Sequence, residues 1–101
     1  MELNQFDVLM DINREAFDDG DYDLAYHVLA AAYWCACHYE DLEQALLIER
    51  MARTQGEWID NHAPYYEHST YQVKNRDSSK GGMFNELALQ ASELNRILRL
   101  I

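Results

Sequence analysis

The sequence predicts an all-α protein, a small bundle of four helices with one long loop before the last helix. Apolar residues recur at steps of three and four along most of the chain, which is the spacing of one helix face. One proline and four glycines in 101 residues leave few turn residues for a sheet of many strands. A chain of this length has room for one domain with one hydrophobic core.

The first helix is expected over about residues 2–18. Its apolar stripe consists of Phe6, Leu9, Met10, Asn13, Ala16 and Phe17. Residues 18–21 then interrupt the pattern, because Gly20 suits the left-handed turn that closes a helix and Asp21 is a good N-cap for the next helix.

The second helix, expected over about residues 21–39, has no polar face. From Leu24 to Tyr39 the chain contains no Lys, Arg, Asp or Glu. One face carries Ala25, Val28, Leu29, Ala32 and Ala36, and the other carries Leu24, His27, Ala31, Trp34 and His38. A helix that is apolar all round is normally buried all round.

The third helix (about residues 41–62) and the last (about residues 83–100) each have a main apolar stripe and further apolar positions outside it. The main stripes are Leu42, Ala45, Ile48, Ala52, Gly56 and Ile59, and Phe84, Leu87, Ala91, Leu94, Leu98 and Ile101. The further positions are Leu47, Met51, Trp58, Leu89, Ile97 and Leu100. The pattern is compatible with Gly56 either loosening the helix end or permitting close packing. Residues 63–82 show no helical period and are expected to form the long loop.

These surplus apolar positions need a partner, because a bundle of four helices cannot cover a helix on every side. We expect an isologous homodimer, or a protein partner, to cover them. The interface residues that this predicts are Tyr26, His27, Tyr33, Trp34, His38, Met51 and Trp58.

The run 20–25, Gly-Asp-Tyr-Asp-Leu-Ala, followed by Leu29 and Ala32, resembles the turn and second helix of a tetratricopeptide (TPR) hairpin. The resemblance extends over about residues 9–37 and includes Leu9 at a packing position of the first helix. The sequence departs from the family at Asn13, where a small residue is usual, and at Cys37, where proline is usual, and no 34-residue repeat follows. The resemblance implies TPR-like hairpin packing and, by analogy, a role in protein interaction.

Composition excludes several classes of protein. The net charge of −10, from 18 acidic and 8 basic residues, repels a phosphate backbone, so no nucleic-acid binding is expected. The beginning of the chain lacks a secretion-signal profile and no apolar run is long enough for a membrane span. Cys35 and Cys37 point about 200° apart on a helix and cannot bridge, and free thiols suit a reducing, cytoplasmic compartment.

No metal, cofactor or reaction is predicted. Cys35 and His38 share a helix face, but Cys37 points away and no second cysteine pair completes a zinc site. His27 and His38 lie about 16 Å apart along one helix, so they can meet only across a dimer axis. The chain contains no Glu-x-x-His for a di-iron centre and no nucleophile or dinucleotide motif, so we expect a non-enzymatic interaction module.

The alternative is a small-ligand or anion site under residues 62–82, in a ligand-binding protein or minor enzyme. Its polar contacts would be His62, Tyr66, His68, Arg76 and Lys80. Backbone amides at the start of the last helix, with Lys80 nearby, could hold an anion, although no phosphate-loop motif is present. A tyrosine-anchored loop with solvated charges explains the same residues.

Overall fold

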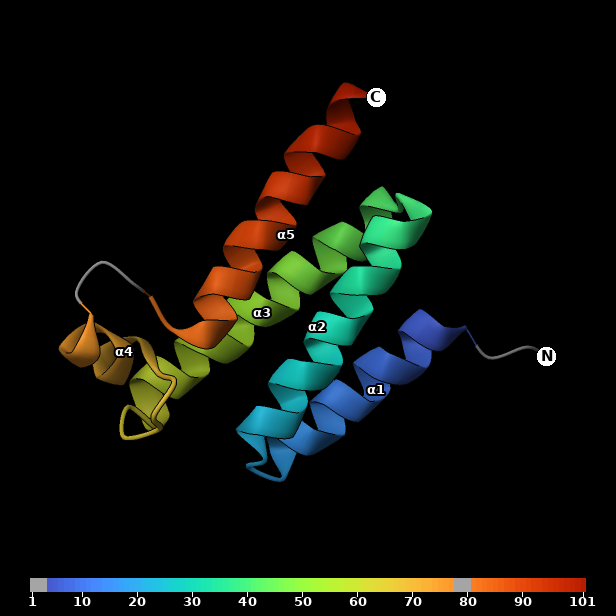
Figure 1. Cartoon of the computed structure of the whole chain (residues 1–101). Helices are drawn as coiled ribbons and strands as arrows, with labels where there is room; N and C mark the ends of the chain where they lie inside the picture. Colours follow the sequence, from blue (N-terminus) through green and yellow to red (C-terminus); the bar gives the residue numbers. More distant parts are fainter. Residues whose placement is uncertain (1–3, 78–80) are drawn as a thin grey trace.

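The computed structural model describes residues 4–77 and 81–101, and within these ranges the chain forms five helices. They are α1 (Gln5–Asp18), α2 (Tyr22–Tyr39), α3 (Leu42–His62), α4 (Thr70–Arg76) and α5 (Met83–Leu100) (Figure 1). The predicted all-α class is therefore confirmed.

Capping residues fix several ends of the long helices. Asn4, Asp21 and Asp41 each accept a hydrogen bond from a backbone N–H in the first turn of the following helix, as N-cap residues do. Gly20 adopts a φ of +79° between α1 and α2, and the left-handed turn predicted there is confirmed. Glu40, with a φ of +50°, ends α2 in the same backbone region.

The helices form two antiparallel hairpins. Figure 1 shows α1 lying along α2 and α3 lying along α5, and α2 joins the hairpins by packing against both α3 and α5. The Cα atoms span 42 × 32 × 16 Å. Because packed helices lie about 8–10 Å apart, the short dimension corresponds to two helix layers.

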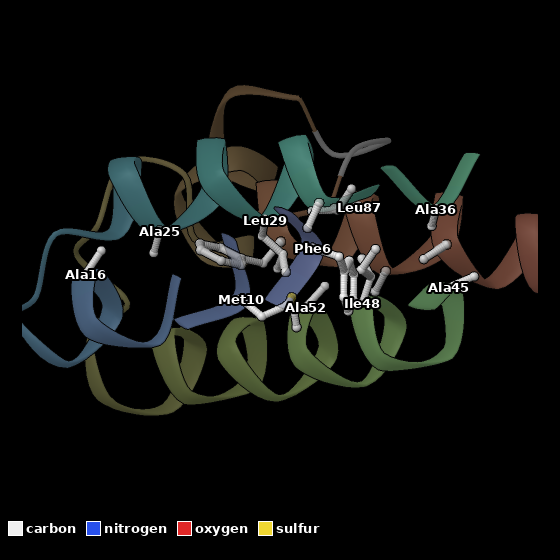
Figure 2. Packing of buried hydrophobic residues seen from close by; sticks show 14 of the residues in the cluster. Phe6, Met10, Ala16, Ala25, Leu29, Ala36, Ala45, Ile48, Ala52 and Leu87 are labelled. Carbon is white, nitrogen blue, oxygen red and sulfur yellow. The ribbon is translucent and has the colours of Figure 1, made fainter. Parts of the chain in front are cut away.

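One cluster of buried apolar side chains joins the two hairpins. Its members are Phe6, Met10, Ala16, Ala25, Leu29, Ala32, Ala36, Ala45, Ile48, Ala52, Ile59, Ala63, Phe84, Leu87, Ala88 and Ala91. Figure 2 shows Leu29 and Ile48 in the middle of the cluster and Ala36 and Ala45 towards the turn from α2 to α3. Small residues at that end allow the helices to approach each other closely.

Gly56 permits close packing between α3 and α5. A Cβ atom at this position would lie 2.6 Å from Asn85 Oδ1 and 3.2 Å from the Cβ of Phe84. Both separations are shorter than ordinary van der Waals contacts, so a side chain at residue 56 would displace the Asn85 amide and push Phe84 of α5 away by a few tenths of an ångström. The structure thus decides between the two roles that the sequence left open for this glycine.

The expectation of a loop throughout residues 63–82 is wrong, because Thr70–Arg76 form α4 at the end of the molecule, beside α3 (Figure 1). The Ser69 hydroxyl caps this helix by accepting from the Gln72 N–H at 3.2 Å. A helix of two turns is too short to show an apolar period in the sequence. α1 also begins at Gln5, later than predicted, because Asn4 is its cap; residues 2 and 3 lie outside the described ranges.

Candidate interaction surface

The packing of α2 divides it into a buried face and an outer face. The buried face consists of Ala25, Leu29, Ala32 and Ala36, each with 0% of its surface exposed. The opposite side carries Leu24, His27, Ala31, Trp34 and His38. We call these five residues the α2 outer face. The alternation follows from the helix period, since residues three and four apart lie on the same side.

Trp34 dominates the α2 outer face. Its side chain is 71% exposed, and Leu24 is 45% exposed. His27 and His38 are also exposed, one on each side of Trp34 along the helix. The nearest charged residues along the chain are Asp23 and Glu40, beyond the two ends of the outer face. The result is a solvent-facing strip that is aromatic and uncharged, which is unusual for an exposed helix face.

A groove between α1 and α2 adjoins this strip. It has a volume of about 390 Å³ and is lined by Gln5, Val8, Leu9, Ala31 and Cys35. None of these lining residues is charged. Ala31 belongs to both the outer face and the groove, so an exposed indole and an apolar hollow lie on the same side of the first hairpin.

The other predicted interface residues are partly covered within the chain. Tyr26, Tyr33 and Met51 are half-buried and pack against the core. Trp58 is 41% exposed, and its ring stacks on that of His62 with centroids 4.6 Å apart. Of the seven residues predicted for the interface, His27, Trp34 and His38 are therefore those that the structure places together on the α2 outer face.

Three partly buried tyrosines have raised pKa values. Burial raises the pKa of Tyr33 to about 12, assisted by a hydrogen bond with the Cys37 side chain and by electrostatic interaction with Cys37. Burial also raises the pKa of Tyr66, whose hydroxyl donates to the Asp23 carboxylate. The pKa of Tyr22 is raised by burial and by Tyr65.

Alkaline pH is expected to destabilise the fold through Tyr33. A tyrosine with a raised pKa keeps its proton in the folded protein when the unfolded chain has already lost it. The stabilisation is complete below pH 10.0, the ordinary value for tyrosine, and is lost between there and about pH 12. Urea unfolding of wild type and Tyr33→Phe from neutral to alkaline pH tests this. The variant should lose less stability above pH 10, and identical pH profiles would contradict the assignment to Tyr33.

The residues predicted for a ligand site are held by separate local contacts. His62 stacks on Trp58, and its Nδ1 lies 3.0 Å from the Trp58 carbonyl oxygen. The rings of Tyr66 and His68 meet edge to face at 5.5 Å, so these two residues are brought together. Arg76 donates to the Glu67 carbonyl oxygen at 2.6 Å. Lys80 lies outside the described residues.

One small hollow lies beneath this segment. The hollow that His68 lines with Asp60, Thr70 and Gly82 has no room for a water molecule. A Cβ atom at Gly82 would lie 2.8 Å from the Thr70 backbone nitrogen, which shows how closely the start of α5 approaches α4. Between residues 62 and 77, the predicted contact residues thus serve packing and local hydrogen bonding.

Two polar clusters were not predicted from the sequence. Asn13 and Gln55 form a reciprocal amide pair inside the core, with Gln55 Nε2 donating to Asn13 Oδ1 at 2.6 Å and Asn13 Nδ2 donating to Gln55 Oε1 at 3.0 Å. Asp60 accepts from Thr70 and Asn85 and so joins α3, α4 and α5. The position of Asn13 in an apolar stripe was a signal, but it did not identify the partner.

The described part of the chain was compared with the requirements of a metal site and of a membrane-spanning helix. There, no three His, Cys, Asp or Glu side chains gather as a metal site would require. None of the helices in these ranges has both the length and the apolar character needed to cross a bilayer.

Comparison with protein-family models, with curated proteins and with solved structures finds no match to this chain. The similarity of residues 9–37 to a tetratricopeptide hairpin therefore stays a resemblance.

Proposed function

We propose that this protein is a non-enzymatic helical interaction module that associates with a second copy of itself through the α2 outer face. The observation that carries the proposal is the 71% exposure of Trp34 in the middle of a helix that has no charged residue between Leu24 and Tyr39. Covering this side chain would remove roughly 100–180 Å² from water, which corresponds to about 3–4 kcal/mol. Left in solvent, such a strip favours aggregation.

The charge of the chain supports this choice of partner class. A net charge of −10 disfavours nucleic acid and anionic membrane surfaces, which leaves a protein surface as the natural partner. The two cysteines are free thiols, and this fits a reducing, cytoplasmic setting.

The other candidate, a small-ligand or anion site among residues 62–82, stays a prediction. The hollow lined by His68, Thr70 and Gly82 is too small for a ligand, and Tyr66 and Arg76 already have partners in Asp23 and Glu67. The exposed Trp34, in contrast, has no cover within the chain, so its burial needs a second molecule.

Sedimentation velocity at micromolar to submillimolar concentration tests the proposal. Wild type is expected to shift from monomer towards dimer as concentration rises, because apolar contact at Trp34 outweighs the repulsion between two acidic chains. Trp34→Glu should remain a monomer throughout. Leu89→Glu is the matched control, since it adds the same charge at a leucine that is 61% exposed on α5, and it should associate as wild type does.

Two results would contradict the proposal. A wild-type chain that remains monomeric at every concentration would exclude self-association. Dissociation by Leu89→Glu, with no effect of Trp34→Glu, would transfer the interface from α2 to α5.

A further inference from the structure

The spacing of the α2 outer face matches the seam of a coiled coil. Leu24, His27, Ala31, Trp34 and His38 follow one another at steps of three, four, three and four, which are the a and d positions of a heptad repeat. They run along a helix of 18 residues. A seam of this kind is covered most completely by a second helix lying along it.

The residues beside the seam allow that second helix to come close. Ala30 and Cys35 flank it, and both are small and partly buried. On the α1 side lies the groove lined by Val8, Leu9, Ala31 and Cys35. Trp34 projects from the same face. An isologous contact brings the same surface of both copies together. A projecting side chain of each copy can therefore fill the hollow of the other.

Charge selects a second copy as the occupant. Two chains of net charge −10 repel each other least where the surfaces that meet carry no charge. The groove between α1 and α3 is lined by charges of both signs, Asp7, Asp11, Arg14 and Arg50, and so is the groove between α3 and α5, by Glu49, Arg96 and Arg99. A charged partner, whether acidic or basic, would find opposite charges in those two grooves. The α2 outer face has no charge to attract it.

We propose that two copies pair through antiparallel α2 helices, with Trp34 of each copy seated in the α1/α2 groove of the other; this rests on the proposed function. A parallel pair would place Trp34 against Trp34 and Ala31 against Ala31, giving layers of unequal size. An antiparallel pair places Trp34 against Ala31 twice, so that a large side chain packs against a small one in each of these two layers. Because Ala31 lines the groove, this match also sets the register, which brings His27 opposite His38.

The contact is modest in size. α2 is about 27 Å long, and the two-helix face is about 20 Å wide. On the order of 500 Å² of each copy is therefore covered, below the roughly 800 Å² per partner of a standard interface. The dimer is expected to dissociate in the micromolar range.

Disulfide trapping tests the orientation and the register. In a Cys35→Ala/Cys37→Ala background, cysteines are introduced at His27 and His38, singly and together, and the proteins are oxidised and run on a non-reducing gel. Within one chain the two positions lie about 16 Å apart, far beyond the reach of a disulfide. The double variant should form covalent dimers. Each single variant should form few, because identical residues lie about 16 Å apart across the antiparallel axis.

The outcomes separate this inference from the proposed function. Cross-linking of the single variants as efficiently as the double variant would show a parallel pair. An uncross-linked double variant whose cysteine-free background still dimerises in sedimentation would show another register or surface. Either result overturns the inference and leaves self-association intact.

A second variant tests the groove without removing the native thiols. Ala31→Met fills the hollow that receives the indole, so the dissociation constant of the dimer should rise at least about tenfold. Gln90→Met, at an exposed position of α5, is the control and should leave the constant unchanged. Equal dissociation constants for Ala31→Met and wild type would contradict a seated Trp34.

Discussion

Replacement of Asn13 by alanine is expected to lower the free energy of unfolding by about 2–4 kcal/mol. Asn13 has 0% of its surface exposed, and its amide partner Gln55 has 3%. The Asn13 amide also donates to the Ala25 carbonyl oxygen at 2.8 Å, so this one side chain links α1 to both α2 and α3. The substitution leaves both polar ends of Gln55 buried without partners, and adds a cavity.

Urea unfolding followed by circular dichroism measures this loss. Asn61→Ala, an exposed asparagine on α3, is the control and should change stability by less than about 0.5 kcal/mol. The double variant Asn13→Leu/Gln55→Leu should lose less than the sum of its two single variants, because it removes both members of the pair together. Strict additivity would show that the two amides act independently.

Removal of the Asp60 carboxylate is expected to release α4 from the rest of the molecule. Asp60 accepts from the Thr70 N–H at 2.9 Å, from the Thr70 hydroxyl at 2.7 Å and from Asn85 Nδ2 at 3.3 Å. A hydrogen bond to a charged group contributes about 1.5–3 kcal/mol. Asp60→Ala should therefore lower the free energy of unfolding by about 2–3 kcal/mol, since the site is partly exposed.

Hydrogen exchange locates the effect of Asp60→Ala. Amides of residues 70–76 should exchange much faster than in wild type. The amides of α1 and α2 should lose only the protection that corresponds to the lower global stability. Asp60→Asn keeps one acceptor oxygen, so the exchange rate of residues 70–76 in this variant should fall between those of wild type and Asp60→Ala. Glu57→Ala, at an exposed position of the same helix, is the control. Unchanged exchange in residues 70–76 of Asp60→Ala would show that other contacts hold α4.

The long helices were predictable because each one carries its own signal. An apolar stripe with a period near 3.6 marks the buried side of a helix whatever packs against it, and Asp21 and Gly20 mark its ends through local chemistry. In the same way, residues 24–39 show without any structure that α2 has no charged side, and the structure places Trp34 on its exposed face.

The remaining features depend on residues far apart in the sequence. α4 has seven residues, and its first residue is held by Asp60, which precedes it by ten positions. Asn13 finds its amide partner 42 positions later. A helical pattern gives the direction of a side chain but not the neighbour it meets. For that reason the sequence assigns Tyr26 and Met51 to one interface with Trp34, whereas in the structure they are partly buried against the core.

The unequal connections of the two hairpins have a kinetic consequence. Three residues, 19–21, join α1 to α2, whereas twenty residues, 63–82, separate α3 from α5. Closing the longer connection costs about 1.7 kcal/mol more chain entropy, on a dependence of (3/2)RT ln n. During folding, the first hairpin can thus form early from local contacts, and the pairing of α3 with α5 follows as the slower step. Until that step is complete, the buried face of α2 lacks its cover from α3 and α5.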